Sequence, residues 1–205
     1  MHMVAFHSFV IVACLLWASL QKPKTILFFG DSLTAGYGLS VEEAFPNLVE
    51  KQLQKKGVAV KVVNAGLSGE TSAGGLTRID WILRQPVDVL VLELGANDGL
   101  RGLPLDQTNK NLQGIIDKVK AKYPQCQLVL AGMMVPPNLG KAYTDQFKNI
   151  YPNLAKKNKA VLVPFLLEGV AGDEKLNLPD GIHPNVEGHQ IVAGNLVKIL
   201  EPLLK

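Results

Sequence analysis

Residues 25–33 read TILFFGDSL, a short apolar run that ends on Gly-Asp-Ser-Leu. The run does not alternate strictly between apolar and polar residues, which is typical of a parallel strand covered on both faces. Four further runs of this kind follow along the chain: Val58–Val63, Val87–Leu94, Gln127–Ala131 and Ala160–Val163. The five runs predict the strands of one parallel sheet.

Stretches with helical periodicity separate these runs. They are Val41–Lys56, Ser72–Arg84, Gln107–Lys122, Tyr143–Lys157 and, closing the chain, Asn185–Leu203. Regular alternation of strands and helices implies a doubly wound α/β sandwich with right-handed crossovers. We therefore expect a three-layer α/β domain over residues 23–205, with no second domain.

The bulk composition excludes several function classes. A net charge of +3 spread over 205 residues is too weak for a nucleic-acid-binding surface, and the lysines are scattered. Cys14 and Cys126 form no CxxC pair, and no cluster of His and Cys has zinc-ligand spacing. The sequence predicts neither a structural metal nor a nucleic-acid partner.

The N-terminal stretch Val4–Leu20 carries no charge. It is short for a membrane span and better matches the apolar core of a secretory signal. We expect residues 1–22 to be a leader and the protein to be periplasmic or extracellular. The segment Ile11–Cys14 resembles a lipoprotein cleavage box, so a lipid anchor on Cys14 is an open alternative, as is an uncleaved membrane tether.

Polar groups follow the apolar runs where each predicted strand ends. They are Gly30–Leu33, Asn64–Thr71 and Gly95–Gly99, while a fourth group, Asp180–Pro184, precedes the last helix. Ligands of open parallel sheets bind beyond the carboxyl ends of the strands. We expect the four groups to converge at one edge of the sheet.

These residue types together suit acyl transfer. A serine hydroxyl needs a base to take its proton, and His183 is the candidate base for Ser32. Asp180, three residues earlier, is suited to holding the imidazole in the right tautomer. The backbone N–H groups of Ser32 and Gly69 and the amide of Asn97 are the available donors for an oxyanion. Each piece alone also fits a simpler interpretation, such as a capping serine or a loop ion pair.

Four blocks carry a resemblance to a known family: Phe28–Gly38 (FFGDSLTAGYG), Asn64–Gly75 (NAGLSGETSAGG), Leu92–Gly102 (LELGANDGLRG) and Asp180–His189 (DGIHPNVEGH). They resemble the signature blocks of SGNH (GDSL-type) hydrolases, in particular the bacterial thioesterase/lysophospholipase/arylesterase branch. The resemblance runs from about Thr25 to Leu203. It implies a flavodoxin-like fold with a central five-stranded parallel sheet.

The resemblance also assigns roles. It implies Ser32 as nucleophile, His183 as base, Asp180 as its partner, and Ser32, Gly69 and Asn97 as oxyanion donors. It further implies hydrolysis of carboxylic esters and acyl thioesters through an acyl-enzyme, without metal or organic cofactor.

The substrate prediction rests on two loops, Gly99–Pro104 and Val135–Gly140, which the resemblance places beside the acyl group. Leu100 in the first loop and Val135 and Pro136 in the second are the predicted substrate-binding residues. We expect a small acyl ester or a single-chain lipid as substrate.

Two other functions stay open at this stage. A carbohydrate O-deacetylase would use the same residues on acetylated sugars. A flavodoxin-like module that binds a phosphorylated ligand is less favoured, because the turn after the first run is not a glycine-rich phosphate cradle.

Glu93 lies inside an apolar strand with no evident function. His189 is expected to be structural, and Asp31 and Asp98 are expected to cap or brace loops.

Overall fold

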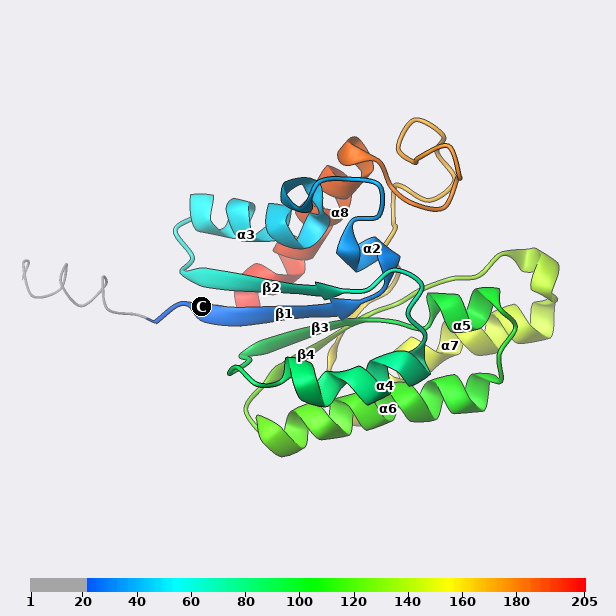
Figure 1. Ribbon diagram of the computed structural model, residues 1–205, viewed down its shortest axis with the longest axis horizontal. Coiled ribbons are helices and arrows are strands. Elements are labelled where there is room, and N and C mark those ends of the chain that lie inside the picture. Colours follow the sequence, from blue (N-terminus) through cyan, green and yellow to red (C-terminus); the bar gives the residue numbers. More distant parts are fainter. Residues whose placement is uncertain (1–21) are drawn as a thin grey trace, which may run out of the picture.

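The computed structural model describes residues 22–205, which form a five-stranded parallel sheet in the order β2-β1-β3-β4-β5 (Figure 1). The strands are β1 (Lys24–Gly30), β2 (Val60–Gly66), β3 (Val89–Glu93), β4 (Gln127–Ala131) and β5 (Val161–Val163). The predicted α/β class and parallel sheet are confirmed. The predicted leader, residues 1–22 with Cys14, lies outside the described residues except for Lys22.

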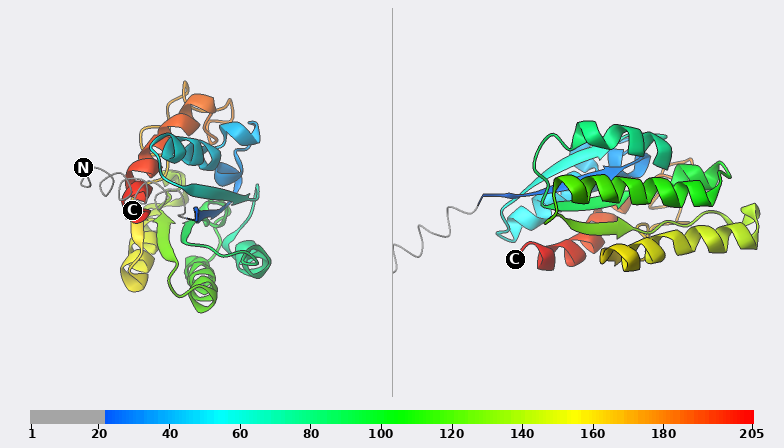
Figure 2. Two further views of the ribbon diagram at one scale, coloured as in Figure 1. Left: turned by 90° about the vertical axis from the view of Figure 1, so that its left-hand side faces the viewer. Right: turned by 90° about the horizontal axis from the view of Figure 1, so that it is seen from below.

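Helices cover both faces of the sheet. On one face, α3 (Phe45–Lys55) packs on α8 (Val186–Leu200); on the other lie α4 (Ser72–Ile82), α6 (Leu105–Lys122) and α7 (Lys141–Asn158) (Figure 2). The chain leaves β1 in one direction to form β2 and then crosses back to form β3 on the other side of β1. Because the crossovers are right-handed, this reversal moves the following helices to the opposite face.

The centre of the sheet explains the unbroken apolar runs. All five residues of β3 are buried, as are the last five residues of β1, so neither strand has a solvent-facing side that would require alternation. In α6, Leu112, Ile115, Ile116 and Val119 recur at helical spacing and are all buried. These side chains form one continuous core with the sheet.

Most element boundaries differ from the expected ones by a few residues, and three differences lie at the carboxyl ends of the strands. Strand β2 runs on to Gly66, because Asn64 and Gly66 pair with Phe28 and Gly30 of β1. Ser32–Ala35 and Ala96–Leu100 form short helices that were not expected, α2 and α5, so Asn97, Asp98 and Gly99 are helical. Helices of one turn are too short to show periodicity in a sequence.

The long connection from β5 to α8 crosses the end of the sheet where β1 and β3 finish (orange, Figure 1). Three short 3₁₀ turns complete the elements: Val41–Glu43, Pro137–Leu139 and Glu201–Leu203. Within residues 22–205, no helix combines the length and the hydropathy needed to cross a bilayer.

Candidate active site

Ser32 is the first residue of α2, immediately after β1. The carboxylate of Asp31 caps this helix by accepting a hydrogen bond from the N–H of Leu33 at 3.1 Å. The Ser32 Oγ lies 2.9 Å from Nε2 of His183, although the two residues are 151 positions apart in the chain. The fold therefore joins the predicted nucleophile to the predicted base.

The base sits in a loop whose geometry is set locally. Oδ1 of Asp180 accepts hydrogen bonds from the N–H groups of Ile182 and His183, at 2.8 and 3.0 Å, and Oδ2 lies 2.8 Å from Nδ1 of His183. The N–H groups of His183 and Ile182 lower the pKa of Asp180 to about 2. An ionised carboxylate only accepts, so Nδ1 carries the proton and Nε2 is left to accept the Ser32 hydroxyl.

Tyr37 covers one face of the His183 ring, with the ring centroids 4.5 Å apart and an angle of 36° between the planes. It follows α2 by two residues and lines the same cavity as the histidine. No sequence pattern indicates this contact, because it joins an exposed loop residue to a distant loop.

The three predicted oxyanion donors lie around Ser32. The backbone N–H groups of Ser32 and Gly69 donate to no other described residue, and both residues line the cavity with Asn97. Gly69 has φ of +77°, a conformation that favours glycine. Gly66, another glycine of the same sequence block, donates its N–H to Asn64 Oδ1 and does not line the cavity.

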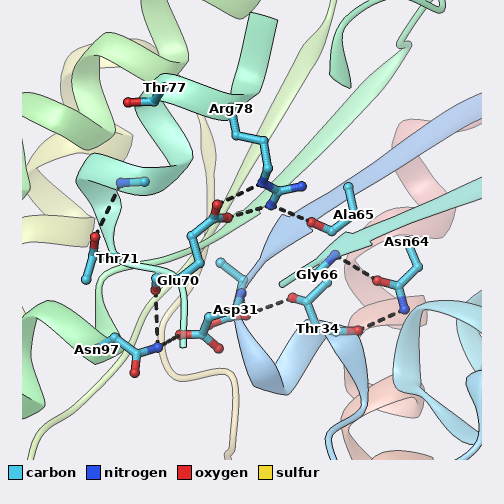
Figure 3. A network of polar contacts seen from close by, with 12 residues as sticks. Asp31, Thr34, Asn64, Ala65, Gly66, Glu70, Thr71, Thr77, Arg78 and Asn97 are labelled. Carbon is cyan, nitrogen blue, oxygen red and sulfur yellow. Dashed lines mark hydrogen bonds and ion pairs between the residues drawn. The ribbon is translucent and has the colours of Figure 1, made fainter. Parts of the chain in front are cut away.

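The amide of Asn97 is held on two sides. Its Nδ2 donates to Asp31 Oδ2 at 3.1 Å and to the carbonyl oxygen of Glu70 at 3.2 Å (Figure 3). An oxyanion bound here would share an N–H with one of these acceptors. The two contacts fix the amide plane before any substrate arrives, which is the condition for preorganised electrostatic stabilisation.

Glu70 connects the Gly69 loop to the rest of the fold. Its carboxylate pairs with Arg78 of α4, whose Nε donates to Oε1 at 2.8 Å, and Nη2 of Arg78 also donates to the Ala65 carbonyl in β2 at 2.8 Å (Figure 3). The guanidinium lies 4.5 Å from the centroid of the Phe29 ring. The pair ties the loop to a strand and to a helix, and the sequence patterns had not singled it out.

The remaining predicted acids brace the site. Asp98 accepts hydrogen bonds from the backbone N–H and the hydroxyl of Ser72, and from the Thr108 hydroxyl. Burial raises the pKa of Asp31 to about 6. His189 is also structural, because its Nδ1 accepts the N–H of Phe45 at 3.0 Å. Between Lys22 and the C-terminus, no group of three or more His, Cys, Asp or Glu residues could hold a metal ion.

A cavity of about 580 Å³ opens at Ser32 and His183. Leu100, Val135 and Pro136, the predicted substrate-binding residues, all line it. Apolar side chains that the sequence patterns missed complete the wall: Met133, Met134, Phe165, Leu167 and Ile182. They come from irregular segments and strand ends, where no periodic pattern marks an inward-facing position. A largely apolar wall beside a serine and a histidine suits an acyl chain.

Comparison with known proteins identifies the family. Residues 28–191 match the model of the GDSL-like lipase/acylhydrolase family, a stretch that contains Ser32, Gly69, Asn97, Asp180 and His183. The chain is 39% identical to the arylesterase of Vibrio mimicus over 203 residues, which cover 97% of this chain and 100% of that protein. It is 42% identical over 182 residues to thioesterase 1/protease 1/lysophospholipase L1 of Escherichia coli (strain K12), covering 88% and 85%.

The fold agrees with the sequence match. The crystal structure of TesA superimposes with a TM-score of 0.83 at 39% sequence identity, covering 88% of this chain and 100% of that one. With the family model spanning most of the described residues, the chain belongs to the GDSL-like lipase/acylhydrolase family, that is, to the SGNH hydrolases.

Proposed function

We propose that this protein is a serine hydrolase that cleaves carboxylic esters and acyl thioesters through an acyl-enzyme. One observation carries the proposal. Asp180, His183 and Ser32 form an unbroken series of hydrogen bonds, 2.8 and 2.9 Å long, at the wall of an apolar cavity. The names of the relatives, arylesterase and thioesterase, support the same chemistry.

In the first step, His183 Nε2 takes the proton of the Ser32 hydroxyl as Oγ attacks the carbonyl carbon of the substrate. The carbonyl oxygen becomes an oxyanion, which the N–H groups of Ser32 and Gly69 and the amide of Asn97 stabilise. The imidazolium is stabilised by the Asp180 carboxylate and then returns its proton to the departing alcohol or thiol. The products are the free leaving group and an ester between the acyl group and Ser32.

In the second step, a water molecule attacks this ester with His183 again as base. The same donors stabilise the second oxyanion. The carboxylic acid departs, and Ser32 Oγ regains a proton from Nε2. No metal or organic cofactor enters either step.

The cavity favours acyl groups longer than acetyl. A volume of about 580 Å³ with an apolar wall lies within the range of pockets that bury whole small molecules. We infer a small acyl ester or a single-chain lipid as substrate, rather than an acetylated sugar. Initial rates on p-nitrophenyl esters from acetyl to dodecanoyl measure the preference for acyl-chain length. A preference for acetyl alone would favour the O-deacetylase. Tight mononucleotide binding without ester cleavage would instead favour a binding module.

The test of the nucleophile combines labelling and substitution. A fluorophosphonate should label the protein once, and peptide mapping should place the label on Ser32. Ser32→Ala should lower kcat by about 10⁶-fold, because the nucleophile is lost. Ser40→Ala, a serine that does not line the cavity, is the matched control and should keep full activity. Ester hydrolysis that survives Ser32→Ala contradicts the proposal.

We also propose that residues 1–22 export the protein to the periplasm or the cell exterior. The support is the uncharged stretch Val4–Leu20. Fractionation of cells with the intact chain and with a Cys14→Ser variant tests it. Loss of membrane association in Cys14→Ser alone would indicate a lipid anchor, and a purely cytoplasmic protein would contradict export.

A further inference from the structure

Glu93 is the last residue of β3 and is completely buried beneath the candidate nucleophile. Its Oε2 accepts two hydrogen bonds, from the backbone N–H of Asp31 at 3.1 Å and from the hydroxyl of Thr34 at 2.7 Å. These two donors stand on either side of Ser32 in the chain. One carboxyl oxygen therefore bridges the turn that carries the nucleophile.

Gly30 shows how closely this carboxyl group approaches the turn. A Cβ added at Gly30 would collide with both the Glu93 carboxyl group and the Thr34 hydroxyl. A glycine is therefore required before Asp31-Ser32 so that Glu93 can reach under the turn. The requirement comes from the close approach of Thr34 and of the carboxyl group and backbone of Glu93, and not from the backbone angles of Gly30, which lie outside the left-handed region.

The surroundings of Glu93 disfavour a negative charge. Its second oxygen, Oε1, accepts no hydrogen bond from the described residues. Burial, and then the neighbouring carboxylate of Asp31, raise the pKa of Glu93 well above its usual range. Among the other titratable groups, Tyr151 of α7 cannot carry a positive charge, and His183 acts on Asp31 and not on Glu93, so no cation offsets a charge on Glu93.

Asp31 is better placed to be the ionised member of the pair. It accepts hydrogen bonds from the Leu33 N–H and from the amide of Asn97. Two adjacent buried carboxyl groups do not both ionise. The proton therefore belongs to Glu93, and the Asp31 carboxylate is free to orient the Asn97 amide.

We propose that Glu93 is a positioning residue for the nucleophile, a neutral carboxyl group that fixes the Ser32 turn by bridging Asp31 and Thr34. The proposal rests on the proposed function, in which Ser32 attacks the substrate. Through Asp31 the same group also sets the amide of Asn97, so it acts on both the attacking oxygen and one oxyanion donor. It touches no substrate, since it does not line the cavity.

The experiment compares Glu93→Gln with Glu93→Leu. Glutamine has the shape of a neutral glutamic acid and offers the same acceptor to Asp31 and Thr34, so kcat should stay within roughly threefold of wild type. Leucine removes the acceptor, so the N–H of Asp31 and the hydroxyl of Thr34 stay buried without a hydrogen-bond partner. Displacement of Ser32 should then lower kcat by about 10²-fold. KM should change little in both variants, because neither alters the cavity wall.

Two further variants separate positioning from general destabilisation. Thr34→Val removes one of the two bridged donors and should lower kcat by roughly tenfold. Ile116→Ala removes a buried core side chain of α6 outside the cavity and should lower Tm while leaving kcat unchanged at a temperature where the protein is folded. If Glu93→Leu does not fold, the kcat values of Glu93→Gln and Thr34→Val still test the positioning role of Glu93.

Infrared spectroscopy tests the protonation state directly. The difference spectrum of wild type minus Glu93→Gln at pH 7 should contain the C=O stretch of a protonated carboxylic acid. Absence of this band overturns the proposal, as does a loss of kcat in Glu93→Gln as large as in Glu93→Leu. Wild-type kcat in Glu93→Leu also overturns it.

Labelling distinguishes this failure from failure of the proposed function. If a fluorophosphonate labels a residue other than Ser32, the function itself is wrong. If it labels Ser32 at the same rate in wild type and in Glu93→Leu, only the positioning role of Glu93 is wrong.

Discussion

The two halves of the candidate site are built differently. On the nucleophile side, at the ends of β1, β2 and β3, Asp31, Glu93 and Asp98 are buried and bond to residues distant in the chain. On the base side, the described partners of the half-exposed Asp180 carboxylate all lie two or three positions further on in the chain.

The difference follows from what each half must do. Oxyanion donors are effective only if they are fixed in place before charge develops, which a buried network provides. A base needs the correct tautomer and must lie within hydrogen-bond distance of the nucleophile. A short loop can provide both, because its own backbone N–H groups hold the carboxylate that orients the imidazole. A substitution on the nucleophile side should therefore lower the stability of the fold, whereas a substitution on the base side should lower activity with little change in stability.

Among the substitutions that compare the two halves, the largest expected effect is on the base side. Asp180→Asn should lower kcat by about 10⁴-fold, because an amide nitrogen opposite Nδ1 favours the tautomer in which Nε2 carries the proton. Tm should hardly change, since the asparagine oxygen still accepts the N–H groups of Ile182 and His183. Steady-state kinetics and calorimetry measure both. A large drop in Tm would show that this loop is not the locally determined half.

Arg78→Met probes the nucleophile side. It leaves the Glu70 carboxylate buried without its cation and should cost about 3–5 kcal/mol of the free energy of unfolding, measured in urea. Lys118→Met is the matched control, because Lys118 pairs with the exposed Asp80 and should cost about 0–1 kcal/mol. Equal losses in the two variants would remove the distinction between buried and exposed pairs at this site.

Asn97→Ala should lower kcat by about 10²- to 10³-fold with little change in KM, because the amide acts mainly on the developing oxyanion. Unlike Asp180→Asn, it should also lower Tm, because the buried carboxylate of Asp31 loses a donor. An unchanged kcat would mean that the two backbone N–H groups suffice.

Acid should lower the stability of the protein through His189 in α8, the helix that follows the loop of His183. Burial, and then His183, lower the pKa of His189 from 6.5 to about 4, whereas Glu43 acts in the opposite sense. The unfolded chain therefore binds this proton before the folded protein does. Stability should fall by about 3 kcal/mol as pH decreases from about 6.5 to about 4.

Urea unfolding at several pH values measures this loss, with His189→Asn as the comparison. The asparagine oxygen still accepts the N–H of Phe45 but does not titrate, so this variant should show a flatter pH dependence over the same range. Parallel curves for the two proteins would show that His189 does not carry the acid sensitivity.

The class of the fold and the central residues of the site could be predicted from short stretches of sequence. Apolar runs alternate with helical periodicity because each strand and each helix is an element of contiguous residues. Ser32, Asn97, Asp180 and His183 stand beside strand ends or before a helix, where the rule for parallel sheets places ligand-binding groups. Their chemistry is unusual enough in that order to be recognised.

Tyr37, Arg78 and the apolar wall of the cavity could not be predicted in this way. Tyr37 contacts a ring on a distant loop, Arg78 reaches back eight positions to Glu70 across a loop that has no period, and no local pattern marks which side chain of the cavity wall turns inward. Glu93 was recognisable as unusual, because it is a charged residue in an apolar strand. Its partners became visible only when β3 was paired with β1.

The sequence by itself determined the order of strands and helices, the type of chemistry and the loop that orients His183, because each depends on residues close together in the chain. Only the tertiary structure decided that His183 reaches Ser32, that Glu93 lies under the nucleophile turn and that Asn97 is held between Asp31 and Glu70. These contacts depend on strand pairing and packing, which bring together groups that no local pattern relates.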